Sequence, residues 1–519
     1  MPIVYLSGLS NQAIDAFVDS ASGQSSEAES LKRTHPDYDA NVAKWEKYLD
    51  FYEANDIYKY LHRHLRETPE MFEQRLARGY YYNYVASVVD LFVCYLFNSP
   101  IARNVGSLSG SVDLARFYAD ANKAGLTYEQ LVRTVAVFAQ ICGHCGVLID
   151  LPKAPEGGYI SEADRLAADH RPYATIIQAP QIKDWEVDQF NKFEWVKIEV
   201  SRPSGRTWKD AIDTSVRTFL IWSRTDWEEY EVRVRDGVEE SRLVDSGENP
   251  LGEVPIVIIC NERNPRHPWF GLSAVRDIVD INKAILNWSS LIDEEVFERC
   301  LNILCMERDE GDAASTLSHH NVLEYAPGAS APFYLTPGSS PLDLIGAQID
   351  RAKDEIYRLA KVGGSTGLLG VREATSGIAY AYEFNETNQA LVQKAACLAA
   401  GENEIHRIFA KWLGKEWDGL IEYPSEFGVE DFLLELKILL TARTTLTSPS
   451  AVRRIEKRLI DKMFSHDTDE FRQQAKREID AAPDDRVVIP PKLQFEDLPA
   501  KPRPQTPDTV VPRTSAITR

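Results

Sequence analysis

The residues Cys142-Gly-His-Cys145 form the motif whose types and spacing best suit redox chemistry. Two cysteines separated by two residues exchange with disulfides when a helix N-terminus lowers the pKa of the first thiol. That arrangement requires a strand before the motif and a helix after it. Here a helical pattern precedes the motif and a strand pattern follows it. The sequence therefore predicts two reduced packing cysteines, and a thiol oxidoreductase using Cys142 and Cys145 is kept only as a distant alternative.

A glycine-rich segment at 363–370 invites comparison with a phosphate-binding loop. Such a loop follows a strand and ends in Gly-Lys-Ser or Gly-Lys-Thr, whereas this segment follows a helical pattern and contains Gly-Leu-Leu-Gly. The histidines form no HExxH pattern, and no second Cys/His pair lies at zinc spacing. We therefore predict no catalytic residue, no metal site and no cofactor, which means a protein that is not an enzyme.

The charge balance restricts how the chain can meet nucleic acid. Lys and Arg number 58 against 79 Asp and Glu, a formal net charge of −21 over 519 residues. Proteins that wrap nucleic acid neutralise its phosphates with a basic surface, so the composition argues against that mode of binding. It does not exclude a surface past which DNA slides.

The N-terminus lacks a secretory signal, and the seven cysteines are interpreted as reduced thiols, so we expect synthesis and retention in the cytoplasm. The most apolar stretch, Tyr84 to Ile101, is interrupted by Asp90, Asn98 and Pro100. It falls short of the uninterrupted apolar length that a bilayer requires, so no membrane span is predicted.

The elements that must position any functional surface begin with a helical, unusually aromatic tract from Asp39 to Phe97. Aromatic residues dominate protein cores, and no basic run interleaves with these. They are predicted to pack between helices rather than to stack on bases. After a further helical tract from Leu114 to Ile141, residues that favour strands predict an antiparallel β region. The expected strands are 146–152, 173–179, 192–201, 215–223, 228–235 and 254–260.

Apolar residues then recur at spacings of three and four from Leu272 to Val296, which predicts a long amphipathic helix. The next expected elements are a small β insert with strands at 301–306 and 321–325, a second amphipathic helix from Leu342 to Leu359, a glycine-rich loop and a third long helix up to Leu413. Two amphipathic helices joined by a β insert can pack side by side and against neighbours in a ring, leaving one polar face for a lumen.

Both ends of the chain differ from the middle. Residues 1–38 are weakly patterned and are expected to order only against a partner, and the proline-rich residues 481–519 are expected to be extended or disordered. Between 451 and 478, eight basic and six acidic residues give a net charge of +2. That balance suits a surface facing DNA and equally suits a solvated mixed-charge helix.

Three tracts carry a resemblance to a known family. They are Asp39 to Pro100 with Trp45, Tyr48 and the run Arg78-Gly-Tyr-Tyr-Tyr-Asn83; Asn249 to Asn261 followed by Gly271-Leu-Ser273; and Thr375-Ser-Gly377 before a helix containing Gln and Ala. In this order and spacing, the chain from about 39 to 480 resembles the portal protein of tailed bacteriophages, in particular a portal-like subfamily first catalogued as a domain of unknown function.

The resemblance implies an α+β, mainly helical, portal-type fold that assembles as a ring of about twelve subunits. The implied divisions are a flexible arm at 1–38, a wing at 39–270 (helical, then antiparallel β), stem helix 1 at 271–300, a clip at 301–340, stem helix 2 at 341–361, a channel loop at 362–376, a long wing helix and loop at 377–428, a helical crown at 429–480 and a disordered tail at 481–519.

Site residues follow from these divisions. The expected channel loop, a mobile constriction, contains Gly363, Gly364, Ser365, Thr366, Gly367, Gly370, Arg372 and Glu373. Candidates for the stem lumen are Asp277, Asp280, Lys283, Glu294 and Lys361, and candidates for stem packing are Ile278, Ile281, Ile285, Ile349 and Ile356. Residues 272–298 hold six acidic and two basic residues, a net −4 per copy, and a lumen sharing part of that charge would repel phosphate. The alternative is that these acids face outward as ordinary helix-surface charge.

The implied role is a virion protein of the capsid portal vertex, assembled in the host cytoplasm. Its expected partners are further copies of itself, double-stranded DNA that passes without sequence specificity, the terminase, a head-tail adaptor, and capsid and scaffolding proteins, with no membrane. The alternative function is another phage head-tail adaptor or assembly protein that shares the helix–strand–helix hairpin.

Overall fold

The computed structural model describes residues 27–155, 157, 159–200, 216–235, 238–299, 303–307, 322–325, 333–335, 340–362, 377–427, 449–463 and 469–481. The chain divides into two compact units, Met1–Gly428 and Val429–Arg519. Helices and sheets are both present, so the predicted α+β class is confirmed. Among the described helices, none has the length and apolarity needed to cross a bilayer.

Several helices of the first unit begin where a side chain satisfies the free amides of the first turn. Thr68 accepts a hydrogen bond from the Met71 amide, and Thr127 and Gln130 form a reciprocal capping box. The helices before the β region are α2 (Pro36–Glu53), α3 (Pro69–Arg78), α4 (Tyr84–Leu96), α5 (Val112–Ala119) and α6 (Tyr128–Cys142), with 3-10 turns η1 (Ile57–Tyr60) and η2 (Gly106–Leu108). Within the β region lie α7 (Glu162–Ala167) and the 3-10 turn η3 (Ala179–Gln181).

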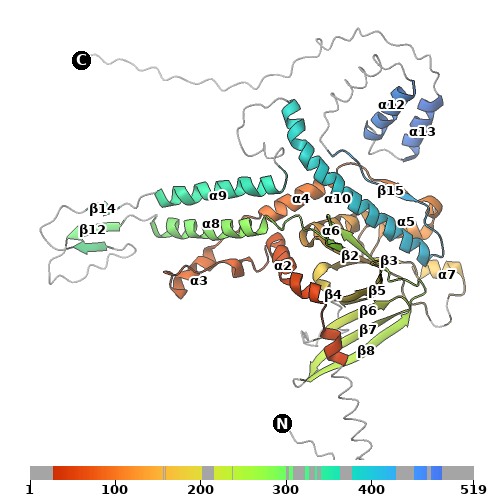
Figure 1. The fold of residues 1–519 in the computed structure, drawn as a ribbon, viewed down its shortest axis with the longest axis horizontal. Coiled ribbons are helices and arrows are strands. Elements are labelled where there is room, and N and C mark those ends of the chain that lie inside the picture. The colour runs from red at the N-terminus through yellow and green to blue at the C-terminus, as the bar shows by residue number, and fades with distance from the viewer. Residues whose placement is uncertain are drawn as a thin grey trace, which may run out of the picture. The chain divides into compact units, whose positions relative to one another are not determined.

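Two antiparallel sheets form the predicted β region (Figure 1). One has the strand order β3 (Tyr173–Gln178), β2 (His144–Asp150), β9 (Ile256–Cys260). The other runs in sequence order through β4 (Ile182–Val187), β5 (Phe193–Val200), β6 (Arg217–Ser223), β7 (Asp226–Arg235) and β8 (Val238–Glu248). The edge strands β4 and β8 were not predicted. β8 is largely exposed and rich in charged residues, as edge strands often are, so it lacks an apolar alternation.

The long helices after the sheets are α8 (Val279–Arg299), α9 (Ser340–Leu359) and α10 (Gly377–Trp412). The prediction that the first of these starts at 271 is wrong. Residues 271–278 instead form hydrogen bonds to other elements: the Ala274 amide donates to Gln140 O (2.8 Å), and the Ser273 hydroxyl donates to Ile141 O (2.6 Å). These contacts hold the segment against the end of α6, so helical hydrogen bonds begin only afterwards.

Short strands complete the first unit. β1 (Ala102–Asn104) pairs with β15 (Leu420–Glu422), and β10 (Arg263–Asn264) pairs with β11 (His267–Gly271). Within the predicted insert, β12 (Ile303–Glu307) pairs in parallel with β13 (Val322–Tyr325) and antiparallel with β14 (Phe333–Leu335).

Residues 27–38 depart from the expected flexible arm. Residues 27–32 are helical, and Ala28 and Leu31 are buried against Phe219 and Val232 of the five-stranded sheet. The Lys197 ammonium donates to Ser30 O and Arg33 O. Burial of two apolar side chains and satisfaction of two carbonyls explain why this segment is held by its own chain.

The aromatic tract lies in the main core, as predicted. Trp45, Phe51 and Phe92 are buried, whereas Tyr80 and Tyr82 are exposed at 40% and 46%. The second unit contains α12 (Pro449–Met463) and α13 (Asp469–Ala481), which pack against each other with an ion pair between Lys457 and Asp480. The rest of the expected crown, at 429–448 and 464–468, and the tail after 481 lie outside the described residues.

Candidate functional site

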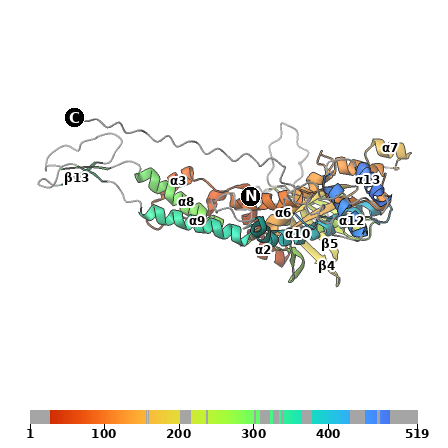
Figure 2. The ribbon, with the colours of Figure 1, turned by 90° about the horizontal axis from the view of Figure 1, so that it is seen from above.

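The helices α8 and α9 lie side by side and run in opposite directions (Figures 1 and 2). In sequence they are joined by the segment that holds β12, β13 and β14. The predicted channel loop lies outside the described residues from 363 to 376, with Gly363, Gly364, Ser365, Thr366, Gly367, Gly370, Arg372 and Glu373 all among them. Lys361 and Val362 are the last described residues before this segment, and α10 follows it.

Two amide side chains anchor α8 to the helices before the β region. The buried Asn282 amide donates to Tyr82 O (2.9 Å) and accepts from the Tyr84 amide (3.2 Å). Asn287 accepts from the His62 amide (2.9 Å) and donates to Tyr60 O. Sequence reasoning missed both residues, because asparagine off the apolar stripe of a helix resembles ordinary surface.

A buried arginine also joins α3 to α8. Arg75 is 1% exposed, and its guanidinium donates to Glu67, to the Ser290 hydroxyl of α8 and to His62 O, each at 2.8 Å. The hydrogen bond from Arg75 lowers the pKa of Glu67. All three guanidinium nitrogens of Arg75 therefore have hydrogen-bond partners, as a buried guanidinium requires.

The acidic candidates for a lumen are largely paired with basic residues of the same chain. Asp280 is paired with Lys47 of α2, and Glu294 with Arg78 of α3. Asp277 lies beside Arg276, and its carboxylate accepts from that guanidinium (3.1 Å). The negative charge counted along this segment is therefore partly neutralised by α2 and α3, which the sequence pattern did not reveal.

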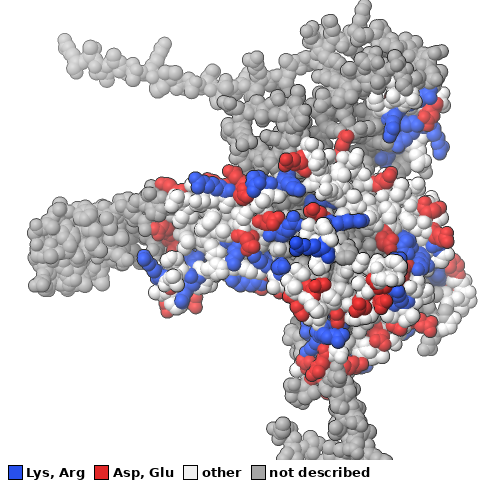
Figure 3. Space-filling view, viewed as in Figure 1, with Lys and Arg blue, Asp and Glu red and all other residues white. Residues whose placement is uncertain are grey.

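The basic candidates differ from each other. The Lys283 ammonium lies 6.0 Å from the centre of the Tyr60 ring, and Lys361 is exposed at the end of α9 with a left-handed backbone. On the face drawn in Figure 3, Lys and Arg alternate with Asp and Glu over α8 and α9 without a band of one sign. The described part of this face is thus a mixed-charge surface.

The isoleucines selected for stem packing lie in or against the main core. Ile278, Ile285 and Ile356 are buried, and Ile281 and Ile349 are half-buried against the same cluster. Ile278 belongs to the turn before α8 rather than to the helix. These isoleucines therefore pack against the core of their own subunit, and a contribution to contacts between subunits stays a prediction.

As the sequence pattern predicted, a helix precedes the Cys142–Cys145 motif and a strand follows it, the reverse of the order in thiol-exchange sites. α6 ends at Cys142, Gly143 caps it, and β2 starts at His144. Cys142 is 2% exposed and Cys145 0%, and burial raises the pKa of both thiols. A buried thiol with a raised pKa is a poor nucleophile, so this geometry favours packing over exchange.

Replacing Cys142 and Cys145 together by alanine should cost about 1 kcal/mol of stability per site, because two small buried groups are lost. Thermal unfolding would measure the loss. In an insulin-reduction assay we expect no turnover from either the unmodified chain or the variant. Turnover by the unmodified chain that the double variant loses would restore the oxidoreductase hypothesis.

His144, between the two cysteines, lies in a box of aromatic rings. Its ring centroid is 5.2 Å from that of Trp45 and 4.9 Å from that of Phe270, and neither ring nitrogen has a hydrogen-bond partner among the described residues. Burial lowers the pKa of His144 to about 3. The imidazole is therefore neutral in the folded chain at every physiological pH.

This lowered pKa predicts acid sensitivity. Below pH 6.5, the ordinary pKa of histidine, His144 is protonated in the unfolded chain but stays neutral in the folded chain. The free energy of unfolding therefore falls by about 1.4 kcal/mol per pH unit down to about pH 3. Urea unfolding of His144→Leu should therefore show a shallower loss of stability between pH 6 and pH 4. The exposed His62, changed to leucine, is the control. Equal pH slopes for His144→Leu and the unmodified chain would contradict the assignment.

No group of three or more His, Cys, Asp or Glu side chains in the described part of the chain is arranged to hold a metal ion. Among the described residues, α8 is held by contacts with α2 and α3 and packs against α9.

No family model and no curated protein matches the chain. Among solved structures, chains from gene transfer agent particles are similar. One is from the "Neck of empty GTA particle computed with C6 symmetry" (12% identity, TM-score 0.40, covering 72% of this chain and 89% of that chain). Another is from the "Virion of native gene transfer agent (GTA) particle" (12% identity, TM-score 0.38, covering 72% and 89%).

A third is from the "Neck of native GTA particle computed with C12 symmetry" (12% identity, TM-score 0.37, covering 70% and 86%). Similarity this low does not transfer a function, so the function has to be argued from this chain's own residues and elements.

Proposed function

We propose that the chain is the portal subunit of a tailed bacteriophage. About twelve copies form a ring at one capsid vertex, and DNA is packaged and ejected through the ring without catalysis by the subunit itself. The terminase, and then a head-tail adaptor, dock on this ring, and capsid and scaffolding proteins surround it.

The observation that carries the proposal is the order of elements from α8 to α10. An antiparallel helix pair is joined through three short strands and is followed by a glycine-rich segment and a 36-residue helix. This is the order stem, clip, stem, channel loop and wing helix that the sequence resemblance implies. The bracing of α8 by Arg75, Asn282 and Asn287 supports a stem that keeps its shape under load.

Exposed apolar side chains near the β12–β14 end of the helix pair support contacts between subunits. Leu344 of α9 is 66% exposed, and Phe297 of α8 is 60% exposed. Large apolar residues at this exposure on a rigid element suit burial by a neighbouring copy. In contrast, Ile285 is 0% exposed within the subunit, so a charge there would test folding rather than assembly.

Leu344→Asp should therefore abolish rings while leaving the subunit folded, because it places a charge where an apolar contact is expected. Native mass spectrometry and averaged electron-microscope views would show closed rings for the unmodified chain and single subunits for the variant, with at least about a tenfold loss in association. Circular dichroism would confirm an unchanged fold.

Ile160→Asp is the matched control, since Ile160 is 99% exposed and lies away from the helix pair. It should form rings normally. An unmodified chain that stays monomeric alone would favour the adaptor over the portal, and normal rings from Leu344→Asp would remove this end of the helix pair from the interface.

A further inference from the structure

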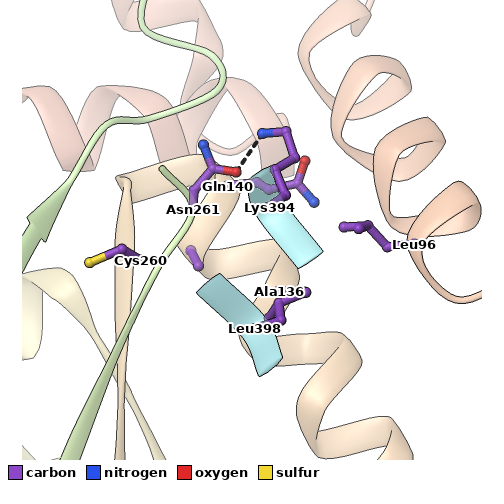
Figure 4. Close-up of a pocket in the computed structure, with 8 residues that line it drawn as sticks. Leu96, Ala136, Gln140, Cys260, Asn261, Lys394 and Leu398 are labelled. Atoms are coloured by element: carbon purple, nitrogen blue, oxygen red, sulfur yellow. Dashed lines mark hydrogen bonds between the residues drawn. The ribbon is translucent and has the colours of Figure 1, made fainter. Parts of the chain in front are cut away.

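A small pocket lies where α4, α6, α10 and the end of β9 meet (Figure 4). The free space in it is small, close to that of a single water molecule. Its walls are mostly apolar, and three polar side chains enter it, Gln140 from α6, Asn261 after β9 and Lys394 from α10. The pocket is unrelated to the exposed helix surfaces discussed above.

Gln140 is the first sign of a missing ligand. The side chain is 2% exposed, and neither its amide nitrogen nor its amide oxygen has a hydrogen-bond partner among the described residues. Figure 4 shows this amide beside Lys394, on the side toward Leu96. A buried primary amide without any partner is costly, so a polar occupant that accepts from its N–H would stabilise the site.

Lys394 is the second sign. It is 8% exposed, and its ammonium donates to Asn261 Oδ1 and lies 4.8 Å from the centre of the Phe92 ring. Within the described ranges, no carboxylate lies within ion-pair distance of it. Burial lowers the pKa of Lys394 to about 7, so the charge is only half retained at neutral pH.

Asn261 does not supply the missing charge. Its amide oxygen accepts from Lys394, and its amide nitrogen already donates to Leu272 O (2.8 Å). The ammonium therefore keeps two further donor positions beyond the one used by Asn261. A cation with free donors, an unpartnered amide N–H and apolar walls together describe an anion site of small size.

We propose that this pocket binds one small monovalent anion, of the chloride type, between the Lys394 ammonium and the Gln140 amide. One cation calls for one negative charge, and the nearly water-sized free space with apolar walls formed by Leu96, Ala136 and Leu398 is too small for phosphate or carboxylate ligands. The anion ties α10 to α6 and to the β3–β2–β9 sheet. Water could partner both atoms of the Gln140 amide, whereas an anion accepts only from its N–H; water, however, leaves the Lys394 ammonium without a counter-charge, which favours the anion.

Binding is coupled to protonation. The other charged or titratable groups that act on Lys394 are Glu262 and Cys397, which favour its charged form, and Lys361 and Arg276, which oppose it. An anion stabilises the ammonium, so it binds more tightly at pH 6 than at pH 8.5, where binding must take up a proton.

The test compares sodium chloride with sodium gluconate at equal ionic strength on the full chain. Chloride should raise the melting temperature at pH 6 by about 2 °C over gluconate, with a smaller difference at pH 8.5. Lys394→Met and Gln140→Leu should lose this difference. Lys415→Met and Gln393→Leu, which change exposed residues on or just after α10, should keep it.

A second measurement stays informative if the pocket variants fail to fold. Crystals of the unmodified chain grown with sodium bromide should show an anomalous peak between Lys394 Nζ and the Gln140 amide. A water without anomalous signal at that position, or an equal response of the melting temperature to chloride and gluconate, would overturn the proposal.

Discussion

Replacing Gly143 by alanine is expected to lower the stability of the chain by about 3 kcal/mol or more. Gly143 has φ +96°, and a Cβ there would lie 2.3 Å from the carbonyl oxygen of Gly271. Gly271→Ala should be as damaging, because its Cβ would lie 1.9 Å from Gly143 O. Both clashes are with backbone, which cannot rotate away. Urea unfolding followed by circular dichroism would measure the losses.

Gly346 provides the matched control. It lies inside α9 without a positive φ, and a Cβ added there would meet no described atom within 4 Å. Alanine there should stabilise the helix by about 0.5 to 1 kcal/mol. A Gly143→Ala chain with an unchanged urea midpoint would show that α6 and the segment before α8 do not meet as described.

Replacing Glu402 by alanine should cost about 3 kcal/mol, because it leaves the half-buried Arg103 guanidinium without its carboxylate. Glu402 of α10 is 0% exposed, and its carboxylate accepts from Arg103 of β1 (2.8 Å) and from the Tyr423 hydroxyl after β15. The pair fixes the small β1–β15 sheet to α10. Thermal and urea unfolding would measure the loss.

A double-mutant cycle measures the interaction free energy between Arg103 and Glu402 separately from the effect of losing each side chain. Arg103→Met with Glu402→Met should be less damaging than Glu402→Ala alone, because no charge remains buried. Glu355→Ala, which breaks an exposed pair with Arg358 in α9, should change stability by less than about 0.5 kcal/mol. Additive losses at Arg103 and Glu402 would mean that the two residues do not depend on each other.

Much of the fold could be predicted because its signals are local. Apolar spacing of three and four located α9 and most of α8, and residues that favour strands located β2, β3, β5, β6, β7 and β9. The order of elements around Cys142 and Cys145 likewise followed from patterns on either side. These are properties of adjacent residues, so they can be recognised without knowing what packs against them.

Residues whose roles depend on distant partners could not be predicted. Asp280 and Glu294 resemble free acids along a helix, and only the packing of α2 and α3 supplies Lys47 and Arg78 as their partners. The start of α8 was misplaced for the same reason, since residues in the segment 271–278 donate hydrogen bonds to carbonyls at the end of α6. Hydrogen bonds across the core outweighed the local helical pattern.

The sequence by itself determined the α+β class, the succession of aromatic helices, antiparallel strands and long amphipathic helices, and the absence of a thiol-exchange geometry at 142–145. Only the tertiary structure decided which charges are neutralised, that Gly143 and Gly271 must touch, and that Gln140 and Lys394 share one pocket. The physical reason is that periodicity reflects the burial of one side of an element, whereas ion pairs, backbone contacts and cavities arise where elements far apart in the chain meet.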